Sequence, residues 1–379
     1  MSVPGWARAL RRLGLVAGGT ALALGVVELA VRWVGSAQGT DLVFMAPMGY
    51  PRDIYVQDGA MTYPNPAFTG TIQSFGYSVK PTFNAWGTRG PAPQTGVRTW
   101  ISVGDSFTIA LQVKDDETFS ARIGQAEGAQ VLNAGVDGYS TWKEALRAVQ
   151  LGRAFPPEVV IANFFTGNDF FDNRQGATHT IEHPGLGPGE PGAPRFKVPV
   201  IGIAPPPPGW FAGMRDHSVL VAHWWAWKES RRARSGNDPN ARRFRDELGL
   251  FTAEGQAKAA ADTQMTEKAL LFFADAAREV GARGVVAVMP PAFAMDVDTA
   301  KRTFESVGFD GATPDLDSAQ NAAIAAAKAA NLLVCDMMPV LRAATAAGER
   351  PYLPFDGHLS VTGHQIVADA LRTCIAAGS

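Results

Sequence analysis

Two segments of the chain carry the residue types of nucleophilic catalysis. Ser106 follows Gly104 and Asp105 at the end of the apolar run RTWISV, and Asp356 and His358 stand together in the segment FDGHLS near the C-terminus. A serine hydroxyl attacks a carbonyl carbon when a base takes its proton. Histidine is the usual base, and a carboxylate orients it. The simpler alternative is an ordinary turn in the first segment, with a loop carboxylate and a surface imidazole in the second.

Two further segments carry groups that stabilise negative charge on a reacting oxygen. Gly138, in NAGVDGYST, follows one apolar run, and Asn168, in TGND, follows the next. An unhindered backbone N–H and an asparagine side-chain amide are typical donors of an oxyanion hole. Each segment also has an ordinary alternative. Gly138 fits a strand-to-helix turn, and Asn168 fits an Asx turn or helix cap, with Asp169 and Asp172 in a capping role.

Two other histidine-bearing segments are weaker candidates. His364 is a second candidate base, but it falls one turn inside the predicted last helix, where packing or capping is the expected role. The segment HTIEH at 179–183 matches the H-x-x-E-H zinc pattern, which requires both histidines on one helical face. Gly176 before it and Pro184 and Gly185 after it disfavour a helix. We therefore expect no metal site, and no P-loop or dinucleotide motif indicates a cofactor.

Short apolar runs and periodic segments alternate around these positions. Strands are predicted at 98–103, 129–132, 158–164, 284–289 and 332–335. Helices are predicted at 116–126, 141–151, 215–233, 263–280, 317–330 and 360–376. Alternating strands and helices indicate a parallel sheet with helices on both faces, in which sites lie beyond the carboxyl ends of the strands.

Composition divides the chain into unequal parts. Residues 1–34 are apolar, residues 35–97 form an irregular lead-in rich in Pro, Gly and aromatics, and residues 98–379 form the α/β domain. A Gly/Pro-rich insertion at about 176–262 interrupts that domain. Lys plus Arg is 34 and Asp plus Glu is 36, a net charge of −2, which argues against a nucleic-acid binder.

The N-terminus predicts a membrane segment. The apolar run at 13–34 would span roughly 33 Å as a helix, about one hydrocarbon core. It is preceded by Arg8, Arg11 and Arg12. Arginines before a span stay cytoplasmic, so the rest of the chain should be exported. Either the run is an uncleaved anchor, with Glu28 near its far end, or it is a signal peptide cleaved near 35–37.

Only two cysteines are present, too few for a disulfide scaffold or a cysteine-ligated metal cluster. In an exported chain Cys335 and Cys374 could pair. The alternative, two small buried residues, is equally consistent with the sequence.

Taken together, the blocks GDSFT at 104–108, NAGVDGYST at 133–141, TGND at 166–169 and DGHLS at 356–360 resemble the SGNH (GDSL-type) hydrolase family. The resemblance covers about residues 80–175 and 260–375. The segment FNAWGTRGP at 83–91 looks like the lead-in of a membrane-anchored, extracytoplasmic branch. Asp356 and His358 are two residues apart, whereas the commonest family pattern has three. Ala110 stands where many relatives have glycine.

The resemblance implies a flavodoxin-like, three-layer α/β/α fold with a five-stranded parallel sheet, and a serine hydrolase site without cofactor or metal. Ser106 would be the nucleophile, His358 the general base and Asp356 the carboxylate that orients it. The oxyanion hole would consist of the N–H groups of Ser106 and Gly138 and the side chain of Asn168.

Three functions follow from this resemblance. The first is a membrane-tethered, extracytoplasmic (periplasmic) esterase, held by residues 13–34, that acts on an ester-bearing small molecule or an acylated envelope glycan. The second is a polysaccharide O-acetyltransferase with the same triad. The third is a catalytically silent accessory subunit that docks on a membrane-protein partner through the 176–262 insertion.

Overall fold

The computed structural model describes most of the chain outside the insertion. The described ranges are 5–38, 54–58, 61–74, 77–176, 198–199, 239–255, 260–354 and 356–378, together with the single residues Ser218, Leu220, Val221, Trp224, Lys228 and Arg231. The HTIEH segment lies outside them, and only those single residues represent the helix expected at 215–233.

A five-stranded parallel sheet forms the centre of the fold, with strand order β10-β9-β7-β5-β6. Its strands are β5 (Thr99–Gly104), β6 (Gln130–Gly135), β7 (Val159–Phe165), β9 (Arg283–Met289) and β10 (Leu333–Asp336). All five predicted strands are therefore confirmed, with small shifts at their ends. Because β5 lies between β7 and β6, the segments that follow these three strands emerge side by side at one edge of the sheet.

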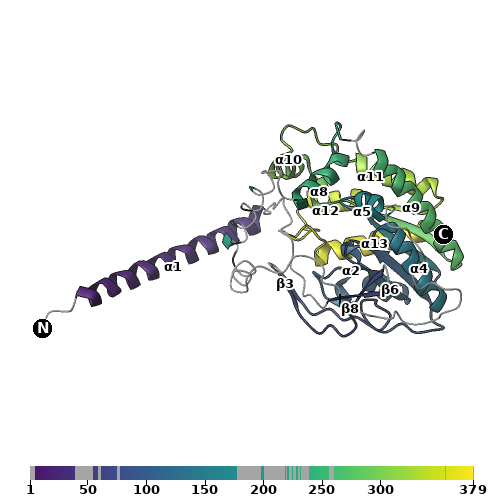
Figure 1. The fold of residues 1–379 in the computed structure, drawn as a ribbon, viewed down its shortest axis with the longest axis horizontal. Helices are drawn as coiled ribbons and strands as arrows, with labels where there is room; N and C mark the ends of the chain where they lie inside the picture. The colour runs from purple at the N-terminus through teal and green to yellow at the C-terminus, as the bar shows by residue number, and fades with distance from the viewer. Residues whose placement is uncertain are drawn as a thin grey trace.

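Two layers of helices cover the sheet, as Figure 1 shows. The main helices are α3 (Phe119–Glu127), α4 (Thr141–Ala154), α9 (Ala260–Glu279), α11 (Ser318–Ala329), α12 (Met338–Ala346) and α13 (Val361–Ala377). Strand side chains alternate between the layers, since successive residues point to opposite faces. Ile101 and Val286 pack in the cluster that includes α4, α9 and α11 residues, whereas Trp100 and Val285 pack in the cluster that includes α3, α12 and α13 residues. The three-layer α/β/α fold is thus confirmed.

The structure corrects several helix predictions. The helix expected at 116–126 is split into a 3-10 turn at Asp115–Glu117 and α3, because Thr118 caps α3 by accepting the N–H of Ala121 at 3.2 Å. The charged residues after 233 predict a loop, but the structure has α8 (Pro239–Leu248) there. A 2.8 Å ion pair between Arg243 and Glu247, one turn apart, stabilises this helix. Helices that the sequence did not predict also occur at α2 (Ser106–Ile109), α5 (Asp169–Gly176), α10 (Val297–Ser306) and α12.

The lead-in is ordered and contains short hairpins. It contains β1 (Tyr55–Asp58), β2 (Met61–Pro64), β3 (Ile72–Ser74) and β4 (Tyr77–Val79), paired as two antiparallel hairpins. A short strand of the insertion, β8 (Val198–Pro199), pairs with β1. Apolar lead-in side chains pack against Ile109, Leu111 and Val136 of the domain, so the lead-in lies against the segments that follow β5 and β6.

The N-terminal helix α1 (Gly5–Gln38) projects away from the α/β domain (Figure 1). Its Arg11–Ala30 part is long and apolar enough to cross a membrane. Glu28 is the one described side chain of this stretch that is partly buried. Its carboxylate accepts hydrogen bonds from the Ser218 hydroxyl at 2.8 Å and the Leu220 N–H at 3.1 Å, so this end of α1 contacts the insertion.

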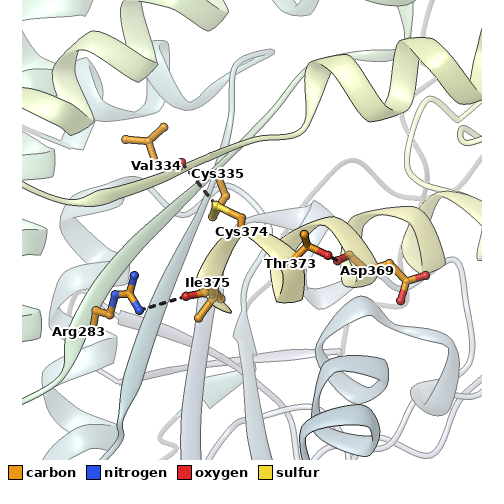
Figure 2. Close-up of a disulfide and its surroundings, with 7 residues drawn as sticks. All are labelled: Arg283, Val334, Cys335, Asp369, Thr373, Cys374 and Ile375. Atoms are coloured by element: carbon orange, nitrogen blue, oxygen red, sulfur yellow. Dashed lines mark hydrogen bonds between the residues drawn. A yellow bond between two sulfur atoms is a disulfide. The ribbon is translucent and has the colours of Figure 1, made fainter. Parts of the chain in front are cut away.

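Cys335 and Cys374 form a disulfide, which decides between the two alternatives left by the sequence. Figure 2 shows that it joins β10 to the last turns of α13, close to the hydrogen bond that Arg283 donates to the carbonyl of Ile375 at 3.1 Å. The bond fastens the C-terminal helix to the edge strand of the sheet.

We predict that replacing both cysteines by alanine lowers the free energy of unfolding by about 3–4 kcal/mol, from the closure entropy of a loop this long. The two residues are 39 positions apart. Urea denaturation checks this, with and without a reductant. Reductant should reproduce the loss in the wild type and leave the double variant unchanged. An unchanged wild-type midpoint after complete reduction would contradict the prediction.

Candidate active site

Ser106 stands at the junction of β5 and α2, on a tightly constrained turn. Asp105 caps α2 by accepting the N–H of Phe107 at 2.9 Å. Gly104 is required because a Cβ there would overlap the Thr108 side chain and lie 3.2 Å from Cβ of Asn163. Ser106 itself is half-buried. The turn therefore fixes the serine at the carboxyl end of the strand.

The structure brings Ser106, His358 and Asp356 together. Nε2 of His358 lies 2.8 Å from Oγ of Ser106, although the residues are 252 positions apart. Nδ1 of the same ring is hydrogen-bonded to Oδ1 of Asp356, which also accepts the His358 backbone N–H at 3.2 Å. The ring lies 4.8 Å, between centroids, from that of Phe107. This geometry allows His358 to accept the hydroxyl proton while Asp356 holds its other nitrogen.

The charges around His358 favour its protonated form. Burial alone would lower the pKa of His358, but the Asp356 carboxylate raises it, with smaller contributions from Asp137 and Asp105, and the net direction is upward. The imidazolium that would form when Ser106 loses its proton is therefore stabilised by the site.

His364 has a packing role. Its Nδ1 accepts the N–H of Phe119 at 3.2 Å, and its ring stacks on that of Phe119 at 5.5 Å between centroids. Burial, with smaller contributions from nearby cations, lowers its pKa to about 3. His364 is thus a neutral acceptor that holds the start of α3 against α13.

Gly138 and Asn168 follow β6 and β7, the two strands that flank β5. Gly138 has φ +69°, and a Cβ there would meet no atom within 4 Å, so its surroundings are open. Nδ2 of Asn168 donates to Oδ2 of Asp172 at 2.8 Å, and Oδ1 of Asp172 accepts from Arg243 at 2.9 Å. The sequence indicates a capping role for Asp172. In the structure its carboxylate instead fixes the direction of the Asn168 amide.

Several carboxyl groups are buried near Ser106. Burial is the main cause in each case: it raises the pKa of Asp105 to about 7, and those of Asp137 and Asp172 to about 6. The pKa values of Glu144 and Asp169 are raised well above the usual range for the same reason. Burial thus disfavours ionisation most strongly at Glu144 and Asp169, whereas pKa values of about 6 leave Asp137 and Asp172 mainly ionised at neutral pH.

Arg89 is a residue of the site that the sequence analysis did not single out. It is buried, and its guanidinium donates to Oδ1 of Asp115 at 2.7 Å and to the carbonyl of Ile109 at 2.6 Å. It also donates to the carbonyls of Ala110 and Val113. Arg89 therefore holds the loop that follows α2. Its only sequence signal is its place in the segment FNAWGTRGP.

In the described part of the chain, no group of three or more His, Cys, Asp or Glu side chains is arranged to hold a metal ion.

Comparison with known proteins matches the C-terminal part of the chain to a family. Residues 249–378 match a family model described as "SGNH hydrolase-like domain, acetyltransferase AlgX". The matched region includes Asp356 and His358 and ends before the C-terminal residue. No curated protein matches the chain.

Solved structures with a similar fold are distant in sequence. LAE5, an alpha/beta hydrolase enzyme from the metagenome of Lake Arreo, Spain, is 11% identical, over 74% of this chain and 96% of its own, with a TM-score of 0.38. A catalytic mutant of an acetylxylan esterase from Geobacillus stearothermophilus is 14% identical, over 75% of this chain and 95% of its own, with a TM-score of 0.38.

The matched region contributes β9, β10, α11, α12 and α13 to the five-stranded sheet and its helical layers. Residues 249–378 are therefore similar to an SGNH hydrolase-like domain, and they lie within a three-layer α/β/α fold.

Proposed function

We propose that the protein is a serine-dependent acyl-ester hydrolase whose triad is Ser106, His358 and Asp356. The observation that carries the proposal is the 2.8 Å approach of His358 Nε2 to Ser106 Oγ, with Asp356 on the other ring nitrogen. A base placed between a hydroxyl and a buried carboxylate has the arrangement that activates a serine nucleophile.

The reaction would proceed through an acyl-enzyme. His358 takes the Ser106 proton as Oγ bonds to the ester carbonyl carbon, and the carbonyl oxygen becomes an oxyanion. The N–H groups of Ser106 and Gly138 and the amide of Asn168 bind that oxyanion. When the intermediate collapses, the ester C–O bond breaks and His358 gives its proton to the leaving alcohol. Water, deprotonated by His358, then attacks the acyl carbon. The bond from that carbon to Oγ of Ser106 breaks, the acid leaves, and His358 returns the proton to Oγ.

A second candidate is acyl transfer, favoured by the acetyltransferase in the description of the matched family. The same residues would serve, except that a sugar hydroxyl instead of water attacks the acyl group on Ser106. The substrate class we propose for either reaction is an ester-bearing small molecule or an acylated envelope glycan.

The two reactions differ in where the acyl group goes. The full-length protein in detergent is incubated with a chromogenic acetyl ester, with and without a glycan acceptor, and both free acetate and acetylated glycan are measured. Acetate release that depends on Ser106 supports the hydrolase. Acetylated glycan at the expense of acetate supports the transferase. If folded protein neither releases acetate nor reacts with a serine-directed phosphonate, the enzyme proposal is wrong and the silent-subunit alternative stands.

We also propose that α1 anchors the domain on the extracytoplasmic side of a membrane. Three arginines precede the apolar run at 13–34, and this favours a cytoplasmic location for that end of α1. A disulfide on the opposite side fits an oxidising compartment. Mass spectrometry of the mature N-terminus distinguishes an anchor from a cleaved signal peptide.

The hydrogen bond between Asp172 and Asn168 predicts a role for Asp172 in positioning. We expect Asp172→Ala to lower kcat/KM about tenfold, because the Asn168 amide loses the acceptor that fixes its direction. Ester hydrolysis measures the effect. Glu247→Ala is the matched control, since Glu247 binds Arg243 at 2.8 Å and the structure shows no hydrogen bond from it to Asn168. Equal losses in both variants would show that the effect comes from α8 and not from Asn168.

A further inference from the structure

The lead-in hairpin reaches the catalytic triad directly. Tyr77, the first residue of β4, donates its hydroxyl hydrogen to Oδ2 of Asp356 at 2.8 Å across 279 positions. This residue lies outside the α/β domain expected from the sequence. The contact therefore ties a segment preceding the domain to the acid of the triad.

The carboxylate of Asp356 is engaged on both oxygens. Oδ1 receives the ring Nδ1–H and the backbone N–H of His358, and Oδ2 receives the Tyr77 hydroxyl. The Asp356 side chain is 3% exposed, so water does not readily replace the tyrosine. Burying a carboxylate oxygen without a hydrogen-bond partner costs free energy. Without Tyr77, the Asp356 carboxylate would also be free to rotate away from His358.

Packing of the lead-in against the domain positions Tyr77. Its ring packs on a cluster of lead-in and domain side chains that includes Ile109 and Val136. Farther along the lead-in, Thr82 donates its hydroxyl hydrogen to Asp115 at 2.6 Å, and Arg89 binds the same carboxylate. The lead-in is thus fastened beside the nucleophile loop, and Tyr77 projects from it onto the triad.

We infer that Tyr77 is a positioning residue of the triad, which acts by holding the Asp356 carboxylate in the orientation that receives His358. The inference rests on the proposed serine-hydrolase function. It makes the lead-in a part of the active site, so that the triad is complete only when the β3–β4 hairpin is docked.

The Tyr77 hydroxyl also tunes the charge of the site. A donor on Oδ2 draws negative charge away from the oxygen that faces His358, so its removal should raise the pKa of His358. The other titratable groups near the ring are Asp105, Asp137 and His364. Tyr77→Phe leaves all three in place, so a change in the pH profile would come from the lost hydroxyl.

The first test is Tyr77→Phe in the full-length protein, which removes one oxygen atom and keeps the packed ring. Phosphonylation of Ser106 and hydrolysis of a chromogenic acetyl ester are followed as functions of pH. We expect kcat/KM to fall about tenfold. The acid limb of its pH profile should move to higher pH by about half a unit. The proton resonances of His358 report the same pKa without any turnover.

Tyr352→Phe is the matched control. It also removes a partly buried tyrosine hydroxyl that donates a hydrogen bond, here to the carbonyl of Pro290 at 2.7 Å. Melting temperatures of both variants show the cost of losing such a bond. We expect both variants to be somewhat less stable, but only Tyr77→Phe to move the pH profile.

A double-mutant cycle decides whether Tyr77 acts through Asp356. In the Asp356→Asn background, Tyr77→Phe should lower activity less than twofold further. Independent, multiplicative losses would overturn the inference, as would a Tyr77→Phe protein with wild-type rate and pH profile. These outcomes are separate from failure of the proposed function, because that failure leaves the folded wild type itself unreactive toward the phosphonate.

Discussion

Replacing Ser106 by alanine is expected to abolish covalent labelling by an active-site phosphonate and to lower ester turnover by about 10³-fold or more. The reason is that Oγ of Ser106 is the atom that His358 Nε2 approaches at 2.8 Å. His358→Ala should lower turnover to a similar degree, since the hydroxyl then has no base. The labelling rate and the hydrolysis of a chromogenic acetyl ester measure both.

Asp356→Asn should reduce turnover by up to about 10⁴-fold while the protein stays folded, because the amide no longer favours the tautomer with the proton on Nδ1 of His358. The effects should also be strongly non-additive, since the three residues act as one unit. A Ser106→Ala/His358→Ala double variant should therefore be no slower than either single variant by more than a small factor.

His364→Gln is the control for the histidine. It removes the rival base, whose Nδ1 is occupied by the N–H of Phe119. We expect it to keep phosphonate labelling and to lose some stability. If His364→Gln abolishes labelling and His358→Ala does not, the assignment of the base is wrong.

Short apolar runs predicted the sheet because its strands are buried on both faces. Residues such as Ile101 and Val286 are buried on one side and Trp100 and Val285 on the other, so the strands are mainly apolar along their length. The segments carrying Ser106, Gly138 and Asn168 follow three such runs, and parallel pairing alone brings them to one edge of the sheet. Their catalytic roles remain predictions.

The contributions of the lead-in could not be predicted in the same way. Tyr77 meets Asp356 across 279 positions and Arg89 meets Val113 across 24, and neither contact repeats with a helical or strand period. The lead-in strands are three or four residues long, too short to show an alternation. Helix α8 was missed for a related reason: its charged residues suggested a solvated loop, but Asp172 neutralises Arg243 within a partly buried pair.

Replacing Arg89 is expected to lower the stability of the protein substantially. The Arg89 side chain is 1% exposed and joins Asp115 to the carbonyls of Ile109, Ala110 and Val113. Removing the guanidinium leaves Asp115, whose side chain is 27% exposed, without its cation, and three buried carbonyls also lose a donor. We expect Arg89→Met to lower the free energy of unfolding by about 3–5 kcal/mol. Urea denaturation measures it.

Arg98→Met is the matched control, because Arg98 also forms a 2.8 Å ion pair, with Glu158, but both side chains are about half exposed. An exposed pair of this kind contributes about 0–1 kcal/mol. Arg89→Lys should recover part of the stability, since an ammonium keeps the charge but cannot reach four acceptors in the plane of a guanidinium. Equal losses in Arg89→Met and Arg98→Met would contradict the assignment.

Arg89→Met should also lower the reactivity of Ser106. The effect would pass through the loop that follows α2 and not through a direct contact. Ala110 is the C-cap of α2 and has φ +55°, a left-handed conformation that costs free energy for a residue with a Cβ. The guanidinium of Arg89 binds the carbonyls on both sides of that strained link, at Ile109 and Ala110. Protein that is still folded after Arg89→Met should therefore react more slowly with the phosphonate. Ala110→Gly in the same background should restore part of the rate, because glycine adopts this conformation without strain.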